Sequence, residues 1–102
     1  MEIRFSDAST EQLFSARELL EARYGAVLSK KIMLRIAVLQ AASTLAAIPT
    51  RAPFNLRKFA KSEYVIDLIR PNALHLACEP ASARHARLIR TIRILGVIDA
   101  AD

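Results

Sequence analysis

The chain has 102 residues, of which 53% are apolar, a length and composition that suit one folded domain and exclude a disordered chain. Its formal charge is +5, from 15 Lys and Arg against 10 Asp and Glu. No apolar run reaches the roughly 18 residues of a membrane span, and no secretory signal or cysteine pair is visible, so we expect one cytoplasmic domain over residues 1–102.

The chain opens with a segment in which apolar and polar residues alternate, over residues 2–6. This alternation is typical of a half-buried strand. Asp7 and Ser9 follow as turn and N-cap residues. Ser9 and Gln12 have the spacing of a capping box, in which each side chain satisfies a free amide at the start of a helix. We therefore expect a strand and then a helix that Ser9 caps.

Two helices are expected in the rest of the first half. Residues 10–24 place apolar side chains at helical spacing, and residues 27–42 repeat them every three to four positions. Gly25, between the two segments, suits a left-handed helix cap. A connection this short predicts that the two helices form an antiparallel hairpin.

The second half changes to the pattern of strands. Residues 64–69 are rich in β-branched and aromatic side chains, and residues 70–72 have turn chemistry. Residues 74–78 and 89–98 form two further strands, and Cys78 is interpreted as a small buried hydrophobe. Helices followed by strands predict an α+β fold with a mainly antiparallel sheet of four to five strands.

The positive charge is concentrated in the second half. Residues 51–93 have nine basic side chains against three acidic ones, whereas residues 1–50 have six against five. This segregation predicts an anionic partner for the second half, because a solvated surface needs charge of either sign but not its separation. The alternative interpretation, a surface charged only for solubility, stays open.

Several sequence stretches, in their order along the chain, resemble a known family. They are IRFSD (3–7), RYG (23–25), FNLRK (54–58), YVIDL (64–68) and IRILGVID (92–99). With them the chain resembles, from end to end, the HigB-type killer proteins of the RelE/ParE superfamily of bacterial toxins. The resemblance implies a RelE-like fold and a toxin that enters the ribosomal decoding site and cleaves mRNA without a metal or other cofactor. It also implies a cognate antitoxin, commonly a HigA-type helix-turn-helix protein, through which alone the toxin contacts operator DNA.

The chain departs from the family pattern where family members have proton-transfer groups. Phe54 stands where many HigB proteins have a histidine, and residues 74–76 are Leu-His-Leu in place of Tyr-Arg-Leu. The RelE branch has lysines where this chain has Val65 and Asp67. The usual Tyr-His ending is replaced by two alanines at residues 100–101.

The implied reaction is an attack of the RNA 2′-hydroxyl on phosphorus, which needs a base, an acid and cations. We predict His75 as the proton-transfer group, with an exposed strand histidine as the alternative. Arg57 and Lys61 are predicted to stabilise the phosphate charge. The predicted RNA-binding residues are Arg51, Arg57, Lys58, Lys61 and Tyr64. Tyr64 either stacks on an unpaired base or packs in a strand pair. The sequence has no Gly-rich phosphate loop and no metal-ligand spacing, so no metal or cofactor is expected.

Three functions remain compatible with the sequence. The first is a ribosome-dependent mRNA endonuclease. The second is a degenerate toxin that binds RNA, ribosome or antitoxin without cleaving, which the missing Tyr-His ending favours. The third is a structural partner that tunes DNA binding by an antitoxin.

Overall fold

The protein, described by a computed structural model over residues 1–100, is an α+β fold. Its helices and strands are, in chain order, β1 (Glu2–Phe5), α1 (Ala8–Ser15), α2 (Arg17–Ala41), β2 (Arg57–Ala60), β3 (Glu63–Asp67), β4 (Asn72–Glu79) and β5 (Thr91–Asp99). Short 3₁₀ turns, η1 (Leu45–Ala47) and η2 (Ala86–Leu88), lie in the two longest connections. The predicted order of strand, helices and sheet is confirmed. None of these helices combines the length and the apolar character of a membrane span.

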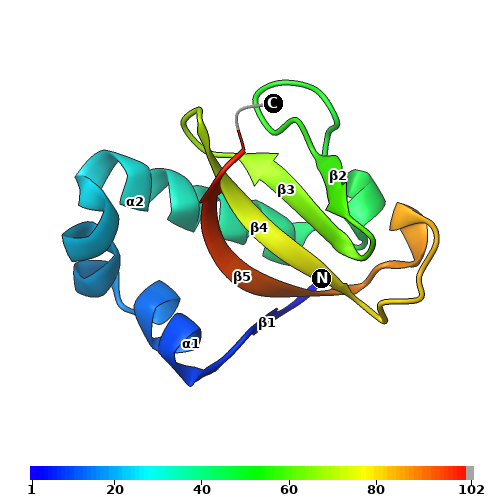
Figure 1. Cartoon of the computed structure of the whole chain (residues 1–102), viewed down its shortest axis with the longest axis horizontal. Helices are drawn as coiled ribbons and strands as arrows, with labels where there is room; N and C mark the ends of the chain where they lie inside the picture. The colour runs from blue at the N-terminus through cyan, green and yellow to red at the C-terminus, as the bar shows by residue number, and fades with distance from the viewer. Residues whose placement is uncertain (101–102) are drawn as a thin grey trace.

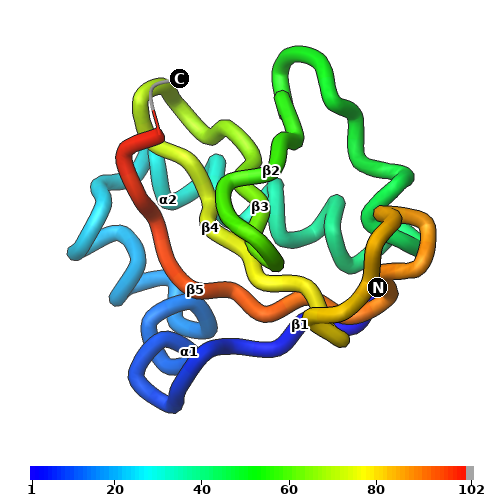
Figure 2. The backbone as a smooth tube through the Cα atoms, turned by 45° about the vertical axis from the view of Figure 1, so that its right-hand side comes forward, coloured from blue at the N-terminus to red at the C-terminus, as the bar shows by residue number. Residues whose placement is uncertain are grey.

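The five strands form one mixed sheet in the order β1-β5-β4-β3-β2. Strands β2 to β5 pair antiparallel with their neighbours, and β1 pairs parallel with β5. The first and last strands of the chain therefore lie side by side (Figure 2). Four of the five strands are antiparallel partners, so the predicted sheet of four to five mainly antiparallel strands is confirmed.

The hydrophobic core lies between the sheet and the helices. The longer part of α2 crosses behind the sheet in the view of Figure 1. Buried side chains from both layers meet there, among them Leu20, Ile32 and Leu39 from α2 and Ile66, Leu74, Leu76, Ile92 and Ile94 from the strands. Cys78 is also buried in this core as a free thiol, as expected for a small hydrophobe. Each strand therefore presents alternate residues to the core and to the opposite face of the sheet.

The start of the first helix differs from the expectation. Asp7, not Ser9, is the N-cap, and its side chain accepts a hydrogen bond of 2.7 Å from the backbone N–H of Thr10. That bond lowers the pKa of the Asp7 carboxyl. A carboxylate also complements the positive end of the helix dipole, which a serine hydroxyl does not. The predicted capping box of Ser9 and Gln12 is wrong, because Ser9 lies inside the first turn.

The extent of the first predicted helix also differs. The chain leaves the helical conformation at Ala16 (φ −117°, ψ 112°), so the expected helix over residues 10–24 is divided into α1 and the start of α2. Gly25 (φ 83°, ψ 165°) is not helical, and α2 consists of two helical segments that meet across a kink at this residue. The ribbon of α2 is visibly bent (Figure 1). The predicted boundary between two helices at Gly25 is therefore confirmed, whereas the first of the two predicted helices is divided at Ala16.

Gly25→Ala should destabilise the protein. The backbone at Gly25 lies in a region that is essentially restricted to glycine, where an L-residue costs on the order of 1–3 kcal/mol. A Cβ at this position would meet no atom within 4 Å, so the cost is conformational and not steric. Urea unfolding measures the change. A stabilisation of about 0.5–1 kcal/mol, as expected for Gly→Ala within regular helix, would show that residue 25 is helical in solution.

Candidate nucleic-acid site on the sheet

The sheet face opposite the core, here called the open sheet face, has no helix over it within residues 1–100 (Figure 1). Paired residues of neighbouring strands point to the same face. One row across this face consists of Arg57, Val65, His75 and Gly96. The next row consists of Ala60, Glu63, Ala77, Arg93 and Arg4. The register therefore brings two predicted site residues, Arg57 and His75, into one row, separated by a single strand.

His75 forms a close pair with Glu63. Its Nε2 atom lies 2.7 Å from Oε1 of Glu63, on the adjacent strand. The His75 side chain is 16% exposed and that of Glu63 is 34% exposed, so the pair is partly shielded from water. An ionised carboxylate only accepts hydrogen bonds, so the tautomer that fits this contact has its proton on Nε2. In the neutral imidazole, Nδ1 then keeps a lone pair that can accept a proton from a substrate.

The ring of Phe59 lies against the imidazole. The two ring centroids are 5.0 Å apart, with the rings inclined at 67° in an edge-to-face contact. Phe59 is 51% exposed, which is unusual for a large aromatic side chain. A half-exposed aromatic surface of this kind suits the stacking of an unpaired base.

Arg57 is held by the protein itself. Its Nη1 donates to the carbonyl of Asn55 at 2.8 Å and to Oδ1 of Asp67 at 3.0 Å, and its Nη2 donates to the carbonyl of Ala100 at 2.7 Å. These bonds tie the loop before β2 and the end of β5 to β3. These bonds use three of the five N–H donors of the guanidinium, and Asp67 balances its charge. Arg57 therefore has a structural role, and the catalytic role predicted for it stays a prediction.

Asp67 lies at the centre of a polar cluster that also contains Arg57, Asn55 and Arg35. Its side chain is 5% exposed and also accepts a hydrogen bond from Nδ2 of Asn55 at 2.8 Å. Burial raises the pKa of this carboxyl, but the hydrogen bonds from Asn55 and Arg57 and the charges of Arg57 and Arg70 outweigh burial and lower it overall. Buried Arg35 donates to the backbone carbonyl of Asp67 at 2.9 Å.

Phe54, which stands at the position of the family's histidine, has a packing role. The guanidinium carbon of Arg35 lies 4.6 Å from the centre of its ring, within the range of a cation–π contact. Phe54 also packs against the hydrophobic core. The structure thus gives this partly buried side chain a packing role against the core and Arg35.

The other predicted RNA-binding residues are spread over the molecule. Tyr64 pairs with Leu76 and packs against the core, on the opposite side of the sheet from His75, and its burial raises the pKa of the phenol. Of the two interpretations of Tyr64, packing in a strand pair fits this position. Lys58 pairs with Tyr64 and is exposed at the sheet edge, whereas Lys61 is exposed in the turn between β2 and β3. Arg51 is exposed in the loop that precedes β2.

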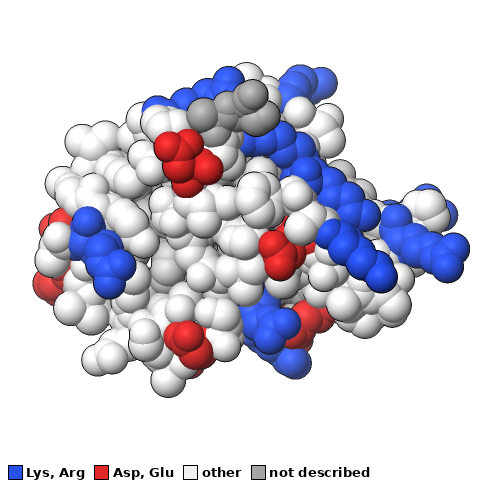
Figure 3. Space-filling view, in the orientation of Figure 1, with Lys and Arg blue, Asp and Glu red and all other residues white. Residues whose placement is uncertain are grey.

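Basic side chains nevertheless form a continuous band beside the open sheet face. Figure 3 shows Lys and Arg gathered along β2 and over the loop between β4 and β5. The exposed basic residues of these segments, here called the basic band, are Lys58, Lys61, Arg84, Arg87 and Arg90. Arg93 lies in the second row of the open sheet face, with Nε 3.5 Å from Oε2 of Glu79. Arg93 thus lies on the same face as the His75–Glu63 pair, whereas Lys58 pairs with Tyr64 and lies on the edge strand of the sheet.

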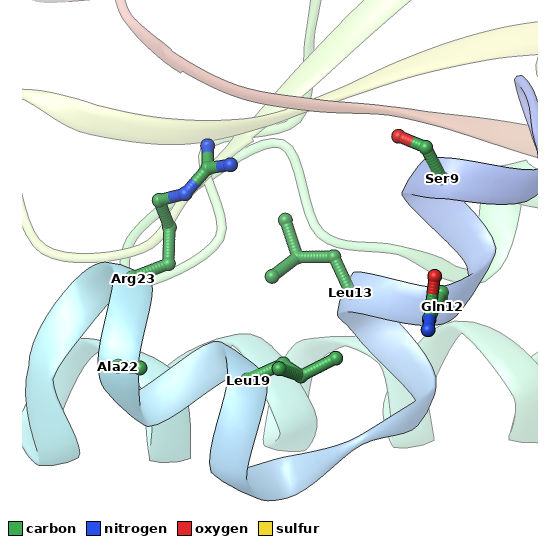
Figure 4. A pocket seen from close by; sticks show the side chains of 6 residues that line it. All are labelled: Ser9, Gln12, Leu13, Leu19, Ala22 and Arg23. Atoms are coloured by element: carbon green, nitrogen blue, oxygen red, sulfur yellow. The ribbon is translucent and has the colours of Figure 1, made fainter.

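One hollow adjoins the residues described above, and a second lies apart from them. One of about 360 Å³ lies beside the Arg57–Asp67 cluster and is lined in part by Thr50, Asn55 and Arg70. Another, of about 460 Å³, lies between α1 and the first turns of α2, with Leu13 and Leu19 inside it and Ser9, Gln12 and Arg23 at its rim (Figure 4). The second hollow shares no residue with the open sheet face. Among residues 1–100, no group of three or more His, Cys, Asp or Glu side chains is arranged to hold a metal ion.

The sequence-based search missed Glu63 and the contact of Phe59 with His75. A signal for Glu63 was present, because the turn at residues 70–72 sets the register of the β3–β4 hairpin. With Val65 opposite His75, Glu63 becomes the diagonal neighbour of His75 on the same face. No comparable signal predicted the contact of Phe59 with His75, because strand β2 changes register between Lys58 and Ala60.

No protein-family model, curated protein or solved structure matches this chain. The open sheet face and the charges around it therefore carry the functional conclusion.

Proposed function

We propose that this protein is the toxin of a type II toxin–antitoxin pair and acts as a ribosome-dependent mRNA endoribonuclease. The observation that carries the proposal is the His75–Glu63 pair beside the exposed ring of Phe59, on a sheet face bordered by the basic band. The order of strand, helices and mixed sheet is compatible with the RelE-like layout that the resemblance implies.

In the proposed reaction, His75 moves the proton. Nδ1 of the neutral imidazole accepts the proton of the 2′-hydroxyl as that oxygen attacks the neighbouring phosphorus. The bond to the 5′-oxygen of the next nucleotide breaks, and this oxygen takes a proton from solvent water, to which the imidazolium returns the proton of the 2′-hydroxyl. The products are a 2′,3′-cyclic phosphate and a 5′-hydroxyl. Glu63 is a positioning residue, because its carboxylate fixes the ring orientation and stabilises the imidazolium that forms.

The substrate is held by charge and by stacking. Exposed cations of the basic band neutralise phosphates along the RNA, and Arg93 offers a guanidinium on the open sheet face itself. Phe59 provides the surface on which an unpaired base stacks, and such stacking contributes about 1–3 kcal/mol per base. This arrangement favours single-stranded RNA, whose bases are free to turn out of a helix. On the ribosome, mRNA is presented in this form.

A second candidate function is supported by Arg57. The guanidinium that shares a row with His75 is bound by Asp67 and by two backbone carbonyls, which leaves it less available to stabilise the transition state. A protein in which this cation has become structural fits RNA or ribosome binding without cleavage. The two functions make different predictions for cells, since only the nuclease breaks mRNA.

Induced expression in a bacterial host tests the proposal. The nuclease should arrest growth and produce new mRNA 5′ ends within translated regions, and coexpression of the product of the adjacent gene should restore growth. Growth arrest with intact mRNA would support the binding function instead. Normal growth with intact mRNA would contradict both.

Reversing two charges of the basic band should weaken RNA binding. Lys58→Glu with Lys61→Glu should make ribosome association less salt-dependent, because each lost phosphate contact reduces the slope of log K against log [salt] by roughly 0.7–0.9. Arg57 is left intact, since its loss would disturb the fold. Lys30→Glu with Lys31→Glu, on α2, is the control of equal charge change. An unchanged slope in the first variant, or equal effects of both, would show that the band does not contact RNA.

A further inference from the structure

A cleft lies between α1 and the first turns of α2. It consists of the hollow of about 460 Å³ described above and an adjoining hollow of about 290 Å³, which share Ser9, Leu13 and Arg23. In Figure 4, Leu13 of α1 and Leu19 of α2 extend into the space between the helices, and Arg23 extends from α2 beside Leu13. The two hollows together are here called the α1–α2 cleft. The larger hollow alone has the volume of a small-ligand site, roughly 300–1,000 Å³.

The α1–α2 cleft reaches the sheet at the edge of β5. Strand β1 ends opposite Ile94, so from Leu95 onward no strand of the described part of the chain lies on that side of β5. The smaller hollow is lined there by Leu95, Gly96 and Val97. Gly96 is also the partner of His75 in the first row of the open sheet face. Gly96 therefore borders both the cleft and His75, and it adds only backbone between them.

Arg23 gives the cleft a positive charge that the protein does not neutralise. Among residues 1–100, its side chain is the only charged one that lines either hollow. Within the part of the chain that the structure describes, Arg23 forms no ion pair, whereas Arg17 on the same helix is paired with Glu21 at 3.1 Å. The acidic residues of the two flanking helical segments line neither hollow; they are Asp7, Glu11, Glu18 and Glu21. The cleft thus selects a group with negative charge.

The rest of the lining specifies more than an anion. Leu13, Leu19 and Ala22 give the larger hollow an apolar floor, and Ser9 and Gln12 provide a hydroxyl and an amide at its rim. An inorganic anion would leave the apolar floor without a partner. A nucleotide matches both parts, because its phosphate suits a guanidinium and its base combines apolar faces with a hydrogen-bonding edge.

We infer that the α1–α2 cleft binds one nucleotide of single-stranded RNA beside the bond at His75, with a phosphate on Arg23 and the base over Leu13 and Leu19. The strand passes from His75 over the bare backbone of Gly96 into the cleft. That the nucleotide belongs to RNA rests on the proposed function. The cleft and the free guanidinium of Arg23 do not depend on it.

Fluorescence anisotropy of a labelled oligonucleotide tests this inference on the whole protein. The probe is a short single strand of 2′-O-methyluridine, which has no free 2′-hydroxyl for the cleavage reaction, so binding is measured separately from chemistry. Arg23→Gln should weaken binding by about tenfold, since a hydrogen bond to a charged group contributes at least that factor. It should also reduce the slope of log K against log [salt] by about 0.7. Ala22→Phe, which fills part of the larger hollow, should weaken binding by about fivefold or more, the lower limit for one bound base.

Matched variants on the same helix separate the cleft from general attraction. Lys30→Gln removes one exposed positive charge of α2, and Ala37→Phe adds a ring at an exposed alanine of α2; neither residue lines the cleft. Both should leave binding within about twofold of wild type. Circular dichroism verifies that every variant is folded. Wild type that does not bind the probe, or equal effects of the cleft variants and their controls, would overturn the inference. So would a polyglutamate peptide that binds as tightly as the probe and with the same dependence on Arg23.

The same proteins, assayed for mRNA cleavage on the ribosome, distinguish this inference from the proposed function. Cleavage by wild type together with unchanged probe binding by Arg23→Gln would refute the cleft and leave the nuclease standing. Probe binding that depends on Arg23 and Ala22, together with intact mRNA, would support the cleft and refute the nuclease.

Discussion

Replacing His75 by alanine should lower the single-turnover rate of mRNA cleavage on the ribosome by about 10²–10⁴-fold, the usual contribution of general acid–base catalysis. The loss is expected because the 2′-hydroxyl is a poor nucleophile until a base accepts its proton. The affinity for the ribosome should stay nearly unchanged, since a neutral imidazole adds little to phosphate attraction. Stopped reactions with end-labelled mRNA, analysed over a range of pH, measure the rate and the affinity separately.

The chain offers a matched control and a second variant for this experiment. His85→Ala removes the only other histidine, which is exposed in the connection before β5, and should cleave at the wild-type rate. Glu63→Gln keeps a hydrogen-bond acceptor beside Nε2 but removes the charge that stabilises the imidazolium. It should change the shape of the pH–rate profile, which a merely structural role would leave unchanged. A His75→Ala protein that cleaves as fast as wild type would eliminate His75 as the proton-transfer group.

Replacing Asp67 by alanine should lower the free energy of unfolding by about 2–4 kcal/mol. The substitution leaves the guanidinium of Arg57 without its counter-ion and the amide of Asn55 without its acceptor. Such a loss is a large fraction of the stability of a small domain. Urea unfolding should show it as a shift of the midpoint, and thermal unfolding as a decrease of about 4–8 °C in Tm for each kcal/mol.

The stability that Asp67 provides should depend on pH in a definite direction. The pKa of its carboxyl is lowered on folding from the ordinary value of 3.8, so the folded state prefers the ionised form. The contribution is therefore complete above that ordinary value and is lost as the pH falls through the lower value of the folded state. The difference in unfolding free energy between wild type and Asp67→Ala should be constant at neutral pH and decrease in acid.

Asp99→Ala, which removes an exposed carboxylate of β5, is the control for charge alone and should change stability by less than about 0.5 kcal/mol. Equal stability of Asp67→Ala and Asp99→Ala would contradict the central position of Asp67 in the polar cluster. A difference that grows in acid would contradict the direction of its pKa shift.

The elements that depend on local pattern could be predicted from the sequence. Alternation and β-branched residues located the strands, and the order of helices and strands predicted the α+β fold. The ends of the helices were harder to predict. Asp7 and Ser9 can both cap a helix, and only the structure shows which of them the first turn uses. The break at Ala16 had no sequence signal, since alanine is a strong helix former.

The candidate site was only partly predictable, because its residues meet through sheet register. The position of His75 on a strand followed from its apolar neighbours, but its partner Glu63 required the pairing of β3 with β4. Arg57 was predicted as a catalytic cation from its place in a basic stretch. Its role depends on Asp67 and on the carbonyl of Ala100, which is 43 residues away along the chain. Charge patterns in a sequence do not reveal which cations the fold itself neutralises.

The central claim is that the open sheet face cleaves RNA with His75 as its proton-transfer group. Its most direct test is a single-turnover reaction of the wild-type protein with end-labelled mRNA on programmed ribosomes, followed by identification of the new ends. The proposed function predicts cleavage that yields a 2′,3′-cyclic phosphate and a 5′-hydroxyl. Intact mRNA with the protein bound to the ribosome, or fragments that end in a 5′-phosphate, would contradict it.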